Sequence, residues 1–182
     1  MRGKIVVIGI IVLLITIGLN GCVSESPISK GNVKFTISDV IITNKLEIKE
    51  YFTNKTKNET SNDTKFVILS LTIENNENKW LAVQTTPGLT GLNDDEGNKY
   101  QAEWFVEIND STYSVEQISL INKDEAFNGG TDIKPNSTEL KKIVFTLPIE
   151  IKPVTLTLSY GFMANKETTP TQWFETEINI PS

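Results

Sequence analysis

The clearest pattern in the chain is a period of two over positions 66–75, with one apolar face and a second face that begins with Phe66 and Ile68 and becomes polar towards the end. In an extended chain such a pattern places every second residue on the same face. Burial of each apolar side chain is worth about 1.5–3 kcal/mol, so this face needs a second sheet to cover it. We therefore predict that residues 66–75 form the central strand of a β-sandwich. The apolar residues on the face to be covered are Val67, Leu69, Leu71 and Ile73.

Shorter alternations of the same kind predict the other strands, and no amphipathic helix pattern follows the N-terminal segment. In the first of them the phase shifts at Asp39, which predicts a β-bulge or a switch between sheets. The pattern favours one all-β domain over residues 33–182. Its expected strands are residues 33–43, 80–83, 104–108, 113–121 (a strand, or a strand and a short helix), 140–148, 153–162 and a last edge strand within 164–182.

A polar insertion at about residues 44–64 interrupts this pattern, and we expect it to be a mobile loop outside the core, since residues 53–63 have little to bury. It contains three sequons four residues apart, whose candidate glycosylation sites are Asn54, Asn58 and Asn62. The competing interpretation is that a chain rich in Asn, Lys and Thr forms sequons by chance.

The N-terminus has the features of an export signal. Two basic residues precede the apolar run 5–19, which is too short to span a membrane as a helix. The sequence Leu19-Asn20-Gly21-Cys22 resembles the lipobox of prokaryotic lipoproteins, although Asn20 is unusual there. That family attaches a diacylglyceryl group to the cysteine and cuts the chain before it.

We therefore predict a signal peptide over residues 1–22, lipidation of Cys22 and a flexible tether over residues 23–32. The protein would lie on the outer face of the cytoplasmic membrane, held by the lipid. The alternative is an uncleaved N-terminal helix that serves as the anchor.

Composition argues against two classes of function. Removal of Arg2 and Lys4 with the signal peptide leaves 15 of the 17 basic residues against 23 acidic ones, a net charge of −8. An acidic chain without arginine is a poor partner for nucleic acid. With no histidine and no second cysteine, the usual general base and thiol nucleophile are missing, so we expect no enzyme and no cofactor. Glu103 and Glu107 could form a glycosidase pair, but nearby acids on strands are usually solvated.

Two further groups of residues are candidate sites. The acidic segment 93–98 could bind calcium through Asp94 and Asp95, but its spacing does not match an EF-hand and a hairpin turn at Gly97 is favoured. Exposed aromatic residues could hold a glycan, a peptide or a partner protein; the candidates are Trp80, Trp104 and Trp173. A binding module and a structural protein of the cell envelope therefore remain alternatives, separated by where the tryptophans point.

The order of these pieces resembles the DUF4352 family. The matching features are the opening strand, the long strand that ends in asparagine, the acidic turn before Tyr100, and a proline turn that leads into Ile143-Val144-Phe145. The resemblance covers residues 33–162; the insertion and the Trp173 tail depart from it. It implies an immunoglobulin-like sandwich on an exported or lipid-anchored protein, with a binding or structural role and no catalytic residues.

Overall fold

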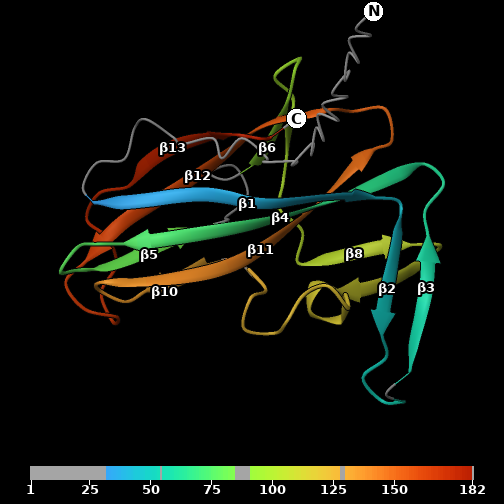
Figure 1. Ribbon diagram of the computed structural model, residues 1–182, viewed down its shortest axis with the longest axis horizontal. Coiled ribbons are helices and arrows are strands. Elements are labelled where there is room, and N and C mark those ends of the chain that lie inside the picture. Colours follow the sequence, from blue (N-terminus) through green and yellow to red (C-terminus); the bar gives the residue numbers. More distant parts are fainter. Residues whose placement is uncertain (1–31, 54, 85–90, 128–129, 182) are drawn as a thin grey trace, which may run out of the picture.

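The computed structural model describes residues 32–53, 55–84, 91–127 and 130–181, and these consist almost entirely of β-strands with one 3-10 turn at Val115–Gln117 (Figure 1). The strands are β1 (Val33–Thr43), β2 (Lys45–Lys49), β3 (Thr56–Thr60), β4 (Thr64–Asn75), β5 (Trp80–Gln84), β6 (Gly91–Asp94), β7 (Lys99–Tyr100), β8 (Phe105–Ile108), β9 (Ser111–Ser114), β10 (Gly130–Ile133), β11 (Ser137–Pro148), β12 (Pro153–Met163) and β13 (Phe174–Asn179). The predicted signal segment, Cys22 and most of the tether lie outside the described residues.

The first sheet has three antiparallel strands in the order β1-β4-β11. The strand predicted to be central, β4, lies in the middle and pairs along its whole length with β11. The pairing of β1 with β4 shifts register between Ile37 and Asp39, which confirms the predicted bulge.

The second sheet is built around β12. Ser159 pairs with Glu175 of β13 on one edge and with Gln84 of β5 on the other. Leu156 pairs with β13 and with β6 in the same way, so β5 and β6 lie one after the other along a single edge of β12. Strand β10 pairs with β5, and β7 pairs with β6. As predicted, the C-terminal strand β13 is an edge strand.

This connectivity is that of an immunoglobulin-like sandwich. Strands β1, β4 and β11 occupy the positions of strands A, B and E in one sheet, while β5, β12 and β13 occupy those of C, F and G in the other. Strand β10, which directly precedes β11, pairs with β5 and not with β11, so it belongs to the second sheet. The predicted fold class is therefore confirmed.

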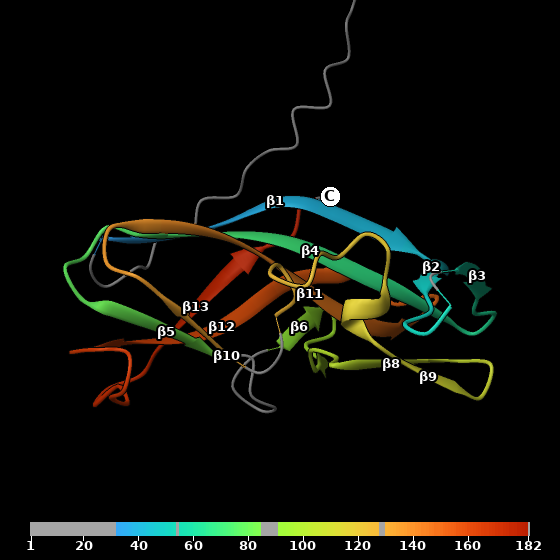
Figure 2. The same cartoon turned by 90° about the horizontal axis from the view of Figure 1, so that it is seen from below.

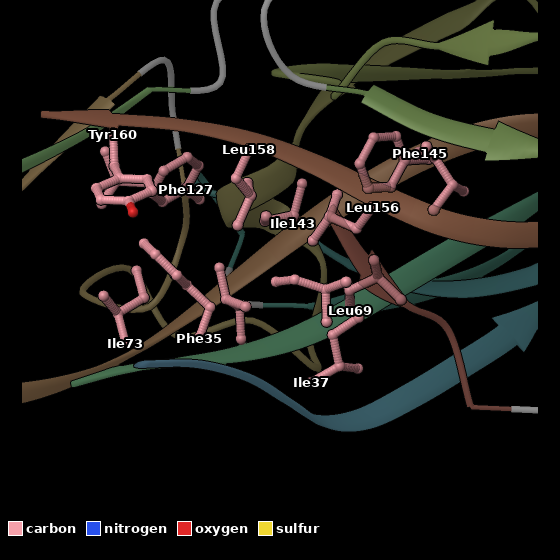
Figure 3. Close-up of a cluster of buried hydrophobic side chains, with 14 of the residues drawn as sticks. Phe35, Ile37, Leu69, Ile73, Phe127, Ile143, Phe145, Leu156, Leu158 and Tyr160 are labelled. Atoms are coloured by element: carbon pink, nitrogen blue, oxygen red, sulfur yellow. The ribbon is translucent and has the colours of Figure 1, made fainter. Parts of the chain in front are cut away.

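The main core lies between the two sheets. Leu69 and Ile73 of β4 face Leu156 and Leu158 of β12, and Phe35 packs on Tyr160 with ring centroids 5.1 Å apart (Figure 3). All of these side chains are buried. The even-numbered face of β12 and the odd-numbered face of β4 thus both contribute to the buried apolar surface that holds the sandwich together.

A second, smaller core lies on the opposite face of β4. Phe66 and Ile68 point away from the main core and are 0% and 1% exposed. They are covered by the β2–β3 hairpin and the β8–β9 hairpin, which both views place at one end of the sandwich (Figures 1 and 2). This end of β4 is therefore buried on both faces.

The expectation of a loop at residues 44–64 is wrong. Most of this segment forms the β2–β3 hairpin, and Leu46 and Ile48, one on each side of an exposed Glu47, are buried against Phe66. The first half of the segment holds the hairpin in place, because its two alternating apolar residues, Leu46 and Ile48, are buried in the second core. The turn-rich stretch before Pro135 also contains a strand that was not predicted, β10.

Candidate functional site

A recess of about 520 Å³ lies where the β3–β4 turn, the β8–β9 hairpin and β11 meet. We call it the hairpin recess; it is lined by residues 61–64 and 107–110 together with Glu103, Phe105 and Thr146. Amides, hydroxyls and carboxylates make up most of its lining, and Phe105 is the aromatic member.

Strand alternation on β8 explains which side chains reach this recess. Val106 and Ile108 are buried in the second core, so their neighbours Phe105 and Glu107 point outward. Phe105 is 57% exposed. A large aromatic side chain that is open to solvent and lines a recess is the most informative feature of this surface, because most such side chains are buried.

The turn of the β8–β9 hairpin forms one wall. Ile108 pairs with Ser111, which leaves Asn109 and Asp110 as a two-residue turn with φ values of 50° and 62°. Asn and Asp tolerate this left-handed conformation better than other residues with a side chain. The Asn109 amide also donates to the carbonyl oxygen of Thr60 at 3.4 Å, which ties the turn to β3.

A partly buried hydrogen-bond network joins the two hairpins. Lys57 Nζ donates to the Tyr113 hydroxyl at 2.6 Å and lies 3.0 Å from Glu59 Oε1, to which the Tyr113 hydroxyl donates at 3.1 Å. The hydrogen bond to Tyr113 is the main cause that raises the pKa of Lys57, and the bond from Lys57 is the main cause that lowers the pKa of Glu59. These contacts tie β3 to β9 and so hold the two hairpins, whose turns line the recess, next to each other.

The ionisable residues that line the recess are all acidic: Asp63, Glu103, Glu107 and Asp110. Burial raises the pKa of Glu103 and the nearby Glu107 carboxylate adds to the rise, while a hydrogen bond with Thr146 opposes it. Among the described residues, no group of three or more His, Cys, Asp or Glu side chains is arranged to hold a metal ion. The recess therefore offers hydrogen-bond acceptors and negative potential beside an aromatic ring.

The structure does not bring the three candidate tryptophans together. Trp104 is 48% exposed and precedes Phe105, but it does not line the recess. Trp80 is half-buried at the start of β5, opposite Met163, and Trp173 is 36% exposed just before β13. Trp104 was a candidate by residue type, whereas Phe105 was not. The alternation of Val106 and Ile108 with Phe105 and Glu107 is the sequence signal that could have placed Phe105 on the outer face of β8.

The acidic segment is a turn, as favoured. Asp94 is only 5% exposed, and both carboxylate oxygens are already in use. Oδ1 accepts from the backbone of Glu96 and Asn98 at 3.0 and 2.8 Å; Oδ2 accepts from the Asn98 amide and the Tyr100 hydroxyl at 2.9 and 3.2 Å. Gly97 adopts a φ of 85°. The calcium alternative through Asp94 and Asp95 is therefore not supported by this geometry.

This turn gives a pH-dependent prediction. The hydrogen bond from the Asn98 side chain is the main cause that holds the pKa of Asp94 below its usual value, so the ionised carboxylate stabilises the fold above the unfolded-state pKa of about 3.9. That stabilisation is lost as the pH falls through the lower folded-state pKa. We expect Asp94→Asn to melt below the wild type at neutral pH, and the gap to narrow between about pH 5 and about pH 2. Melting temperatures across this range test it; a constant gap, or an equal effect of Asp95→Asn, would contradict it.

Two of the candidate glycosylation sites are described, and both are exposed. Asn58 lies on β3 and Asn62 lies in the β3–β4 turn, where it lines the hairpin recess; Asn54 lies outside the described residues. Within the part of the chain that the structure describes, no helix is long and apolar enough to cross a membrane.

No family model matches the chain, and no curated protein matches it either. Among solved structures, the chain is similar to the ycdA protein of Bacillus subtilis subsp. subtilis str. 168, provisionally classed as a lipoprotein, with 15% identity and a TM-score of 0.45 over 86% of this chain; it spans 38% of that chain.

It is also similar to the yjhA protein of Bacillus subtilis, with 15% identity and a TM-score of 0.46 over 81% of this chain and 92% of that one. A third similarity is to an uncharacterized β-sandwich protein of Clostridium difficile 630, with 16% identity and a TM-score of 0.34 over 80% and 88% of the two chains. Because all three TM-scores are below 0.5, these similarities do not support the assignment of the sandwich topology, which rests on the strand pairing of this chain.

Proposed function

We propose that the protein is a lipid-anchored binding module of the cell surface, of the DUF4352 type, which holds a glycan in the hairpin recess without catalysis. The observation that carries the proposal is the recess itself, where the exposed Phe105 ring adjoins a set of amide and carboxylate side chains. An aromatic face attracts the weakly positive C–H groups of a sugar ring, and the planar polar groups can accept or donate to its hydroxyls. In ligand sites generally, apolar and aromatic side chains provide the contact area, and a few polar groups fix the orientation of the ligand.

The charge of the recess narrows the class of glycan. Four acidic side chains line it and no lysine does. An anionic polysaccharide would be repelled, whereas a neutral or amine-bearing sugar would not. The same charge disfavours teichoic-acid-like or nucleic-acid ligands, whose phosphates need basic partners. We therefore propose a neutral or amino sugar as the ligand.

Calorimetric titration of the mature chain carrying Cys22→Ala tests the site, with N-acetylglucosamine oligomers, chitosan oligomers and polygalacturonate as probes. We expect one of the first two to bind and polygalacturonate not to bind. Phe105→Ala should weaken binding by about tenfold or more, since an exposed ring that stacks on a ligand is worth about 1–3 kcal/mol.

Trp104→Ala is the matched control, because Trp104 is the neighbouring exposed aromatic residue and does not line the recess. Its affinity should stay within about twofold of the wild type. Equal losses in both variants, or binding of none of the three probes, would overturn the glycan proposal and favour the structural role in the cell envelope.

The anchor has its own test. Two acyl chains on Cys22, at about 0.8 kcal/mol per buried CH₂, would hold the protein firmly on the membrane, where one chain would be marginal. We expect Cys22→Ala to release the protein into the medium or to leave the signal segment uncleaved. Fractionation together with mass measurement decides the matter: unchanged membrane attachment at unchanged mass would show that the lipid is not the anchor.

A further inference from the structure

A second pocket, of about 620 Å³, lies at the opposite end of the sandwich from the hairpin recess. We call it the end pocket. It is lined by Phe162 and Met163 at the end of β12, by Lys79, and by residues of the segment that joins β12 to β13. Thr64 at the start of β4 lines the hairpin recess, while Lys79 follows the end of β4. The twelve residues of β4 separate the two sites by roughly 35 Å.

The walls of the end pocket are held in place. A Cβ atom on Gly161 would come within 2.6 Å of the Gln172 carbonyl oxygen and of Pro170, so the joining segment packs directly on β12. Within this segment the Asn165 side chain accepts from the backbone of Glu167 at 2.9 Å, and the Thr168 hydroxyl donates to the Asn165 carbonyl oxygen at 2.9 Å. Packing and hydrogen bonds therefore fix the shape of the segment that lines the pocket.

The lining combines three kinds of group. Its larger apolar members are Phe162, which is half-buried, and Met163, which is only 4% exposed. Its polar members are three threonines, Lys79 and Glu167. Among the described residues, neither Lys79 nor Glu167 forms an ion pair, and both are exposed. One cation and one anion without partners thus border an apolar surface.

We propose that the end pocket binds a small zwitterion with an apolar body, that is, a free apolar amino acid or a short apolar peptide. Lys79 would bind the carboxylate, Glu167 the ammonium group, and Phe162 and Met163 the side chain. A purely ionic ligand would make no use of the apolar side chains of Phe162 and Met163. A hydrocarbon would leave the charges of Lys79 and Glu167 unpaired and partly desolvated. Methionine is well suited to line such a pocket, because its flexible thioether adapts to ligand side chains of different shape.

The site is independent of the glycan proposal and is tested separately, by NMR titration of the mature Cys22→Ala chain with leucine and with leucyl-leucine. We expect saturable shifts in the signals of residues 162–164 and 167–171 with at least one of the two probes. The probe that binds more tightly shows whether the ligand is a free amino acid or a short peptide. Two analogues test the zwitterion: 4-methylpentanoate lacks the amine, and 3-methylbutylamine lacks the carboxylate. Each should bind about tenfold more weakly.

Lys79→Gln and Glu167→Gln should each weaken binding about tenfold, while Lys166→Gln, an exposed neighbour that does not line the pocket, should have no effect. No saturable shift with either probe up to about 10 mM would overturn the proposal. So would binding of either analogue as tightly as leucine, or an equal loss in Lys166→Gln.

Discussion

A Leu71→Ala substitution is expected to lower the free energy of unfolding by about 2–5 kcal/mol, the usual range for truncation of a buried leucine. Leu71 is 0% exposed, lies in the middle strand of the three-stranded sheet and pairs with Ile37 on one side and Lys141 on the other. Both neighbouring strands hold the backbone in place, so the structure cannot easily collapse into the space left by the missing methyl groups. The expected loss therefore has two parts: the transfer free energy of the buried atoms that are removed, and the cost of the cavity that they leave.

The control for this substitution is Thr72→Ala, one residue away on the opposite face and only partly buried. Ser70, which lies on the same face as Thr72, is only 6% exposed and is therefore a less clean control. We expect Thr72→Ala to cost less than about 1 kcal/mol. Urea unfolding midpoints of both variants give the comparison on one scale; similar losses would show that the two faces of β4 are not buried as described.

Asn75→Ala is the second substitution with a large expected effect. Asn75 is 0% exposed, and its side-chain amide donates to the carbonyl oxygens of Lys79 and Lys134 at 2.9 Å and of Ile133 at 3.3 Å. Its Oδ1 accepts from the backbone of Glu77. A single side chain thus connects the β4–β5 turn to the end of β10, and its removal leaves several buried polar groups without partners. We expect a loss of at least about 2 kcal/mol.

Two further variants separate hydrogen bonding from shape at this position. Asn75→Asp keeps the shape but removes the donor and places a carboxylate beside three carbonyl oxygens, so it should destabilise at least as much as alanine at neutral pH. Asn76→Ala changes an exposed neighbour and should have little effect. An Asn75→Asp protein as stable as the wild type would show that the donated hydrogen bonds do not hold these turns.

The long strands of the sandwich were predictable because each has a strong local pattern. Residues 66–75 and 153–162 alternate over many positions, and the structure extends these strands by only one or two residues. The bulge at Asp39 was visible as a change of phase. In each of these elements the side chains that face the core recur every second residue, so local pattern and tertiary packing agree.

The second core was missed because its signals are short. Strand β2 has only two buried apolar residues, Leu46 and Ile48, and most of the following segment is polar. Their importance depends on Phe66 and Ile68, which lie on the face of β4 that appeared to be the less apolar one. Pairing of segments that are separated in sequence and carry so few apolar residues is decided by tertiary contacts that no local pattern reports.

The candidate sites show the same limit. The hairpin recess is assembled from residues 61–64, 103, 105, 107–110 and 146, so its existence could not be read from any one of these segments. The tryptophans were chosen by residue type, but the aromatic residue that lines the recess is Phe105. The acidic turn, by contrast, was assigned correctly, because Asp94 and Gly97 lie only three residues apart and their turn preferences are local.

The most direct test of the account is NMR mapping of the glycan on the mature Cys22→Ala chain, with the oligosaccharide that binds most tightly in calorimetry. The account predicts saturable shifts confined to residues 61–64, 103, 105, 107–110 and 146, with loss of those shifts in Phe105→Ala and retention in Trp104→Ala. Shifts that map to another surface, or that survive in Phe105→Ala, would contradict the assignment of the hairpin recess as the binding site.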